Sequence, residues 1–260
     1  MNGRIDTDPR ISRRRKAVAR SKRRRIWMGI TAVGLIAVIV WVMFFSPLLD
    51  VRDIKVVGAE HVEAQEVAEV SGLLDRSQNL LTLATDAVAE RVEELPWVKQ
   101  AEVDRMLPGT VRIKITERIP AMVLSLGAAR WTVDAHGVVL QAGEVQPGLP
   151  VLAGVEVGDI SEGLRLMTPE ALDALRAFRS MPRFLRSQIV GVFAPTVERI
   201  SFSLAGGTVV RYGAAEKLAD KNEVLRVLLD RLSDEGKSAA YIDVRVPTSP
   251  AISERPSSTG

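Results

Sequence analysis

The sequence predicts an α+β protein: a single transmembrane helix, then a small mixed domain, then a second domain rich in strands. Three observations lead to this fold class. The 20 residues from Ile26 to Phe45 carry no charge. Residues 49–118 change between the two-residue period of strands and the 3.6-residue period of helices, in the order β-α-α-β-β. Residues 119–246 hold many short strand-like segments and one long amphipathic helix.

Charge is distributed unevenly along the 260 residues. Residues 1–25 contain eleven lysines or arginines and two acidic residues, whereas the rest of the chain contains 24 basic and 30 acidic residues. The net charge of +3 therefore reflects the N-terminal tail rather than the predicted domains. The chain has no cysteine, which excludes disulfides, thiolate nucleophiles and zinc sites with cysteine ligands.

The uncharged segment has the length of a membrane span. A helix of about 20 residues rises about 30 Å, the thickness of the hydrocarbon core of a bilayer. Trp27 and Trp41 lie toward its two ends, where indole rings favour the membrane interface. Because lysine and arginine resist translocation, residues 1–25 are expected in the cytoplasm and the domains outside, as in a single-pass type II protein of the plasma membrane.

Two alternatives concern this N-terminal region. A cleaved signal peptide would usually have an apolar core of only ~7–15 residues and a small-residue cleavage site, and FFSPLLD at residues 44–50 offers no such site. The basic tail could also bind nucleic acid or acidic lipid. It has no interleaved aromatic residues, and setting the membrane topology is sufficient to explain it, so we expect no nucleic-acid partner.

The first domain is predicted over residues 49–118. VRDIKVVGA at 51–59 is typical of a strand that ends in a turn at Gly58. Two amphipathic helices are expected over 61–72, which stops at Gly72, and over 85–97, with Thr85 as N-cap. Residues 94–118 then predict two strands joined by a turn at Pro108-Gly109. In the second strand Val111, Ile113 and Ile115 alternate with polar residues and should face the helices.

The second domain is predicted over residues 119–246. Its helices are expected at 168–181, with Thr168 as N-cap and Pro169 in the first turn, and at 214–236. The last strand begins at Ala239 and alternates polar and apolar residues up to Pro247. Residues 247–260 are rich in proline and serine, so we expect a disordered tail. The remaining strands are expected at 121–126, 130–134, 137–141, 149–154, 188–193, 199–204 and 206–212.

No catalytic or metal-binding spacing is present in the sequence. The motifs GxSxG, HExxH, Ser-x-x-Lys and the phosphate-binding loop are all missing. The acid pairs Glu93-Glu94 and Asp234-Glu235 lie at helix ends, where solvated carboxylates are usual. His61 and His136 are interpreted as turn residues, and a lone Asp134 would be a poor cation site. We therefore expect a protein that is not an enzyme and needs no metal or cofactor. An anchored cell-wall enzyme is the alternative that measured activity would revive.

Several motifs in a fixed order resemble the FtsQ/DivIB family of cell-division proteins. The order of basic tail, single span and two domains agrees with that family. The end of the chain is most similar to its actinobacterial members, and it departs from the proteobacterial pattern after Arg245. The motifs are Pro96-Trp97-Val98, Ala101-Glu102-Val103, Leu107-Pro108-Gly109-Thr110, Glu117-Arg118-Ile119-Pro120, WTVDAHGVVL at 131–140, RYGAAEKLADKNEVLRVLL at 211–229 and YIDVRV at 241–246.

This resemblance implies a POTRA domain over 49–118 and a non-enzymatic role at the division septum. Family members bridge early and late division proteins and bind the FtsB/FtsL pair, through which they help control the septal peptidoglycan synthase. The resemblance also implies a binding surface at the C-terminal edge of the β domain, where a partner segment adds as a strand. A different alternative is a POTRA-bearing component of polypeptide transport, although POTRA domains in that role usually occur in series and this chain has one.

The final strand is the candidate partner-binding site. If it lies at a sheet edge, its free N–H and C=O groups can accept a partner strand. Tyr241 would offer a rigid aromatic contact and Arg245 a charged one. The alternative is an internal strand, with Tyr241 packed on the long helix. The residues assigned to the site are Tyr241, Ile242, Asp243, Val244, Arg245 and Val246.

Overall fold

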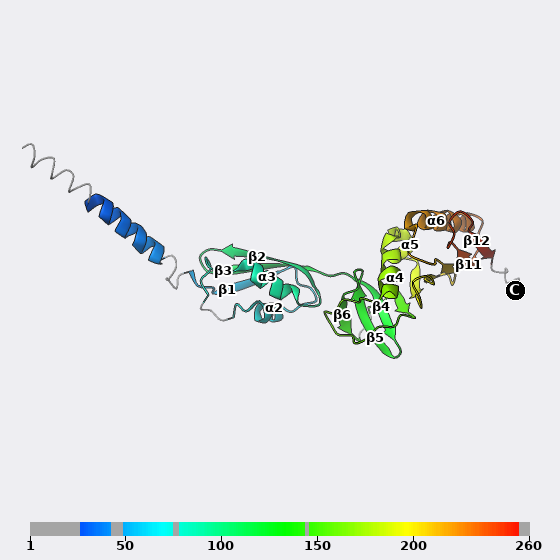
Figure 1. Cartoon of the computed structure of the whole chain (residues 1–260), viewed down its shortest axis with the longest axis horizontal. Coiled ribbons are helices and arrows are strands. Elements are labelled where there is room, and N and C mark those ends of the chain that lie inside the picture. The colour runs from blue at the N-terminus through cyan, green and yellow to red at the C-terminus, as the bar shows by residue number, and fades with distance from the viewer. Residues whose placement is uncertain (1–26, 43–48, 75–77, 144–145, 255–260) are drawn as a thin grey trace, which may run out of the picture.

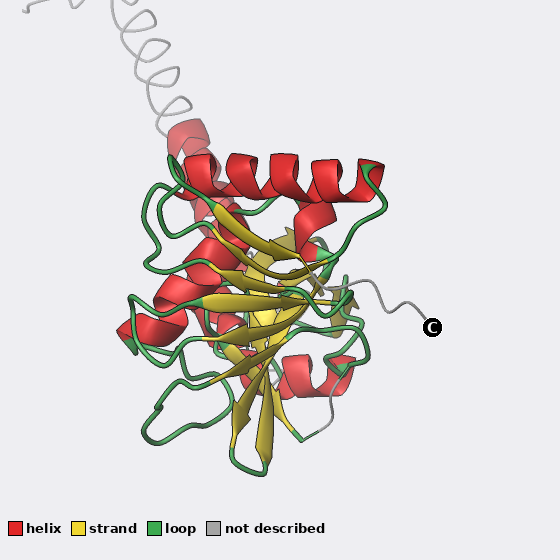
Figure 2. Ribbon diagram, turned by 90° about the vertical axis from the view of Figure 1, so that its right-hand side faces the viewer, coloured by secondary structure: helices red, strands yellow, loops and turns green. Residues whose placement is uncertain are grey.

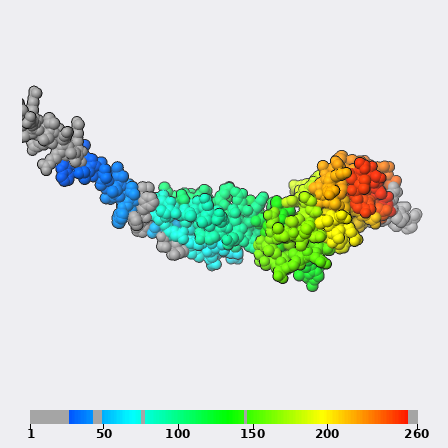
Figure 3. Space-filling model, viewed as in Figure 1, coloured from blue at the N-terminus to red at the C-terminus, as the bar shows by residue number. Residues whose placement is uncertain are grey.

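The computed structural model describes residues 27–42, 49–74, 78–143 and 146–254. A helix over 27–42, the first domain and the second domain follow one another along the longest axis of the molecule (Figure 1). In the space-filling view the two domains touch end to end (Figure 3).

The helix over 27–42 covers most of the predicted span. Trp27 and Trp41 both lie in it, with about three fifths of each residue exposed (61% and 63%). Ile26 and Phe45 fall outside the described residues. In the part of the chain that the structure describes, no helix reaches the length and apolar character needed to cross a bilayer.

The first domain has the predicted order β-α-α-β-β. Its sheet has the order β1-β3-β2, in which β3 runs parallel to β1 and antiparallel to β2. The parallel pair is possible because the two helices connect β1 to the other strands. The elements are β1 (Asp53–Val57), α2 (Ala64–Ser71), α3 (Thr85–Glu93), β2 (Val98–Met106) and β3 (Thr110–Glu117).

The core of the first domain lies between this sheet and the two helices. Val111, Ile113 and Ile115 are buried as expected from their alternation. Gly72 ends α2 in the left-handed conformation, with φ 70°. Gly58 has φ 87°, and a Cβ there would collide with the carbonyl oxygen of Ile115, so the turn after β1 requires glycine.

The second domain is built on a nine-stranded sheet of order β12-β11-β10-β9-β8-β7-β4-β5-β6. Its strands are β4 (Pro120–Leu126), β5 (Ala129–Asp134), β6 (Val139–Ala142), β7 (Val151–Ala153), β8 (Ile189–Phe193), β9 (Ser201–Leu204), β10 (Val209–Arg211), β11 (Ala239–Asp243) and β12 (Ala251–Glu254). Its helices are α4 (Pro169–Ser180), α5 (Arg183–Arg186) and α6 (Leu218–Asp234).

Helices α4 and α6 cover one face of this sheet. Figure 2 shows α6 lying across the strands. Side chains of both helices share one hydrophobic core with alternate strand residues, among them Leu152, Val192, Phe202 and Ile242. The opposite face of strands β7–β10 carries partly exposed residues, including Val151 (37%), Phe193 (50%) and Val209 (40%).

A buried polar network ties α6 to the rest of this domain. The Nζ of Lys221 donates hydrogen bonds to the carbonyl oxygens of Tyr212 (2.9 Å) and Ala214 (2.7 Å). The Tyr212 hydroxyl donates to Oδ1 of Asn222 at 2.9 Å, and the Asn222 amide reaches the carbonyl of Ser180 in α4 at 3.0 Å. Lys221, the second lysine of the RYGAAEKLADK motif, is therefore a structural residue of the core.

The two domains share contacts at their junction. Val138 and Leu140 belong to the second domain by sequence, but they pack into the hydrophobic core of the first. The N–H of Arg118 donates to the carbonyl of Trp97 at 2.7 Å, while its guanidinium bonds Asp134 of the second domain at 3.1 Å. The adjacent residues Glu117 and Arg118 thus lie where the two domains meet.

Several expectations from the sequence are wrong in detail. Residues 251–254 of the tail expected to be disordered form β12, because they can pair with β11 and place Ile252 against the core. The N-cap of α3 is Ala84 rather than Thr85, and Thr168 precedes α4 without a side-chain capping bond. Helix α6 begins at Leu218, after Lys217 in a left-handed conformation, so it is shorter than expected.

Candidate functional site at the C-terminal sheet edge

The predicted partner-binding strand does not lie at the edge of the sheet. Strand β11 pairs in parallel with β10 and antiparallel with β12. Tyr241 stands between Val209 on one side and Ser253 on the other. The end strand is therefore β12, and the alternative of an internal strand describes the position of β11 correctly.

The six predicted site residues separate by face. Ile242 and Val244 are fully buried in the core beneath α6, so their side chains cannot reach a partner. Tyr241 and Asp243 alternate with them and lie on the helix-free face. Tyr241 is therefore not packed on the long helix, contrary to that part of the alternative. Val246 lies beyond the end of β11 and is 57% exposed.

Tyr241 has a cationic neighbour on the helix-free face. The guanidinium of Arg211 lies 4.5 Å from the centre of the Tyr241 ring, within the range of a cation–π contact. Both side chains are anchored on adjacent strands, because Arg211 pairs with Asp243 in the register of β10 and β11. This arrangement presents an aromatic and a positive group side by side.

Asp243 and Arg245 form a local ion pair next to Tyr241. Arg245 donates from Nη2 to Oδ2 of Asp243 at 2.7 Å, and its backbone N–H donates to Oδ1 at 3.1 Å. Hydrogen bonds from Arg245 hold the pKa of Asp243 below its ordinary value. The Arg245 side chain is 59% exposed, so a partner could contact its guanidinium while it remains paired with Asp243.

Gly213 has no side chain and so leaves room for the side chain of Arg245. Gly213 has φ 73°, and a Cβ at this residue would lie 2.9 Å from Cγ of Arg245. A larger residue would have to displace that arginine. The glycine of the RYG motif and the arginine of the YIDVRV motif are thus in contact, although 32 positions separate them in the sequence.

Strand β12 is the element that the sequence reasoning missed. It is four residues long and starts directly after Pro250. Ala251 is exposed, whereas Ile252 is partly buried against the core. The one local signal was the β-branched Ile252 within a run of three uncharged residues, Ala251 to Ser253. It was outweighed by the surrounding prolines and serines, which favour disorder by composition.

The two histidines contact carboxylates. Nδ1 of His61 lies 2.7 Å from Oε2 of Glu117, and the His61 ring stacks on Trp97 with 4.3 Å between the ring centres. Nδ1 of His136 lies 3.8 Å from Oδ2 of Asp134. Asp134 also accepts the backbone N–H groups of His136 and Val138 and the Arg118 guanidinium, so structural contacts engage both of its oxygens.

Comparison with known proteins relates both domains to bacterial cell division. Residues 49–118 match the model of the POTRA domain of FtsQ type. Residues 127–245 match the model of the C-terminal region of the cell-division proteins FtsQ/DivIB. The two matches follow the domain division seen in the structure.

Relatives named cell division protein FtsQ resemble most of the chain. The protein of Corynebacterium glutamicum is 30% identical over 206 residues, which cover 79% of this chain and 90% of that protein. The protein of Anaeromyxobacter sp. is 30% identical over 245 residues, covering 92% and 82% of the two chains. The protein of Mycolicibacterium smegmatis is 29% identical over 204 residues, and the match spans 78% of this chain but only 59% of that longer protein.

Proposed function

The chain belongs to the FtsQ/DivIB family of cell-division proteins, and on this basis we propose that it is a membrane-anchored, non-enzymatic scaffold of the division septum. In this role it links early and late division proteins. It binds partners similar to FtsB and FtsL, and through them it helps to control septal peptidoglycan synthesis.

The observation that carries the proposal is the end strand β12. In the described sheet it has a neighbour on one side only, so the other side offers backbone N–H and C=O groups to an added strand. Pro250 precedes β12 and Glu254 ends it, and both are residues of the kinds that protect sheet edges from pairing, so the uncharged stretch open to a partner strand is Ala251–Ser253. A partner strand would thus add to β12 rather than to β11.

The predicted site residues take a different part in this proposal. Tyr241, Asp243 and Arg245 lie on the helix-free face one strand away from the edge, so they would contact side chains that flank the added strand. Strands are about 4.8 Å apart, which places the partner within reach of long side chains two strands from it. Ile242 and Val244 support the sheet from within.

The anchor is proposed from the sequence. Residues 26–45 are an uncharged run of membrane-spanning length, and the basic residues 1–25 favour a cytoplasmic N-terminus. Both domains would then lie outside the plasma membrane, with the β12 edge at the end of the molecule far from the helix over 27–42 (Figure 1).

Introducing charged residues into β12 tests whether a partner strand adds to this edge of the sheet. We expect Ala251→Lys with Ser253→Lys to weaken binding of the full chain to its FtsB/FtsL-like pair by at least about tenfold, since charges on an edge strand oppose pairing. The matched control is Ala129→Lys with Ala142→Lys, two exposed alanines of β5 and β6 at the opposite end of the sheet. Surface plasmon resonance would measure binding, and the variants compared should have the same melting temperature as the unchanged protein.

Unchanged affinity in the double variant would contradict strand addition at β12. Tyr241→Ala combined with Arg245→Glu tests the flanking side chains separately. A fluorescent fusion in dividing cells tests the role itself: we expect a midcell band that needs the two outer domains, and a uniform envelope signal through the division cycle would contradict a septal scaffold.

A further inference from the structure

A cationic groove lies at the junction of the two domains, away from the β12 edge. It consists of two hollows on either side of the turn Ala135–Gly137, since Ala135 and His136 line both. One has a volume of about 670 Å³ and lies between the end of β3 and helix α5. The other has a volume of about 390 Å³ and lies between residues 165–167 and helix α4. We refer to the two together as the junction groove.

Basic side chains predominate in the junction groove. Seven lysines or arginines and three carboxylates line it among the described residues. Each carboxylate is already paired: Asp173 with Arg176, Asp134 with Arg118, and Glu117 with His61. The five cations without a carboxylate partner in the described part of the chain are Lys99, Arg165, Arg179, Arg183 and Arg186.

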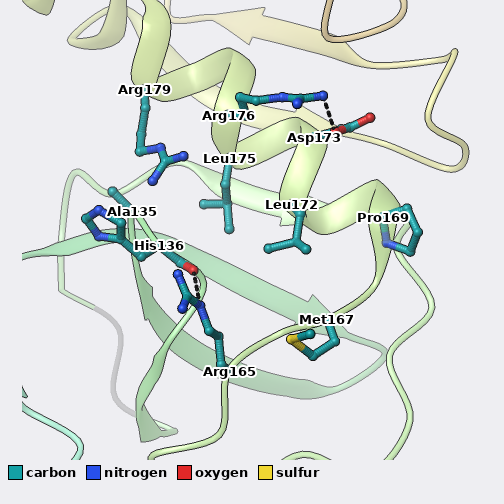
Figure 4. Close-up of a pocket in the computed structure, with 10 residues that line it drawn as sticks. All are labelled: Ala135, His136, Arg165, Met167, Pro169, Leu172, Asp173, Leu175, Arg176 and Arg179. Carbon is teal, nitrogen blue, oxygen red and sulfur yellow. Dashed lines mark hydrogen bonds and ion pairs between the residues drawn. The ribbon is translucent and has the colours of Figure 1, made fainter.

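Two of the unpaired cations approach the turn Ala135–Gly137. Figure 4 shows Arg179 of α4 and Arg165 of the facing segment extending toward His136 from opposite walls. Nε of Arg165 donates to the carbonyl oxygen of His136 at 3.3 Å, which fixes the guanidinium beside the turn. Arg183 and Lys99 continue the basic lining into the larger hollow, where they come from different domains.

The groove is also partly apolar. Met167 is 75% exposed and Ile119 is 81% exposed, and each lines one of the hollows. Leu172 and Phe178 form the walls behind them. Large exposed apolar residues among unpaired cations fit a ligand that carries both acidic and apolar groups. A purely anionic polymer would leave the apolar surfaces uncovered.

We propose that the junction groove binds an acidic, partly apolar segment of a partner polypeptide. Membrane lipids are a poorer fit, because the whole first domain separates the groove from the helix over 27–42 (Figure 1). Strand β2 alone has nine residues, which corresponds to about 30 Å at the usual rise of a strand. A bound segment would touch both domains and so hold their relative orientation. This binding does not depend on strand addition at β12.

The test uses the full chain in detergent and a labelled synthetic peptide of aspartate, glutamate, leucine and glycine. Fluorescence anisotropy would measure binding, which we expect to weaken when salt rises from about 50 to about 300 mM, because the ions screen the charges. Two peptide comparators separate the contributions: one replaces the acids by their amides, and the other replaces leucine by serine. Both should bind at least about tenfold more weakly.

Charge reversal locates the site. We expect Arg165→Glu with Arg179→Glu and Arg183→Glu to reduce affinity for the acidic peptide by about tenfold or more. The control carries the same change in net charge on exposed residues outside the groove: Lys55→Glu, Arg199→Glu and Lys217→Glu. It should bind as the unchanged protein does.

Three results would overturn the proposal. These are equal loss of binding in the groove and control variants, equal binding of the amide peptide, and preference for a poly(glycerol phosphate) chain over the peptide. The variant Ala251→Lys with Ser253→Lys distinguishes this site from the β12 edge, because it should keep peptide binding whether or not it binds the FtsB/FtsL-like pair.

Discussion

Nη1 of Arg118 lies 3.1 Å from Oδ2 of Asp134, and this ion pair joins the last residue of the first domain to a turn of the second. The Asp134 side chain is only 4% exposed and that of Arg118 20%, so water screens the pair weakly. The same carboxylate accepts two backbone N–H groups of its own turn. One side chain therefore shapes the turn and fastens the domain junction.

Replacing Arg118 should loosen this junction. We expect Arg118→Ala to lower the free energy of unfolding by about 1–3 kcal/mol, because a nearly buried carboxylate loses its charged partner. Urea unfolding would measure the change, and small-angle scattering would detect a wider range of domain orientations. The control Lys114→Ala breaks the exposed pair with Glu102, which should change stability by less than about 1 kcal/mol. Equal effects of the two substitutions would contradict the role given to Arg118.

Glu117 makes the first domain sensitive to acid. Burial raises the pKa of this carboxyl, but hydrogen bonds from His61 and from the N–H groups of Glu60, His61 and Val62 outweigh burial and bring the pKa below the ordinary 4.5. A lowered pKa in the folded state gives stability that is present above pH 4.5 and is lost as the pH falls through the folded value.

The variant Glu117→Gln should show this dependence. We expect it to lose about 1–2 kcal/mol of stability at neutral pH, since a charged acceptor of several hydrogen bonds is replaced. The difference from the unchanged protein should shrink as the pH is lowered below 4.5, where the natural glutamate becomes protonated. Thermal unfolding across this pH range would measure it, and a difference that stays constant with pH would contradict the assignment.

Lys221 should be required for stability although it is a buried charge. Burial lowers its pKa, but two carbonyl oxygens accept hydrogen bonds from its Nζ. We expect Lys221→Met to cost about 1–3 kcal/mol, because the carbonyls of Tyr212 and Ala214 would stay buried without a donor. The exposed Lys217→Met is the control and should change unfolding by about 0.5 kcal/mol or less. A neutral or stabilising Lys221→Met would show that desolvation of the charge outweighs its hydrogen bonds.

The pairing partners of the last strands could not be obtained from the sequence. Alternation predicted one apolar face for the last strand, and Ile242 and Val244 are buried while Tyr241 lies on the other face, although the sequence assigned all three residues to the partner-binding site. Which strand stands beside β11 depends on contacts between distant residues, and a four-residue strand after Pro250 gives too short a pattern to be recognised. For this reason the predicted edge moved one strand outward, from β11 to β12.

Local patterns by themselves determined the β-α-α-β-β order of the first domain, the buried face of Val111, Ile113 and Ile115, and the motifs that indicated the family. These features depend on the periodicity of side chains and on glycine turns, which act over a few residues. Only the tertiary structure decided that β12 pairs with the outer side of β11 and that Arg118 contacts Asp134. It also decided that Lys99, Arg165, Arg179, Arg183 and Arg186 line one groove. Those relationships arise when the chain packs, because pairing and burial bring together groups that no local pattern connects.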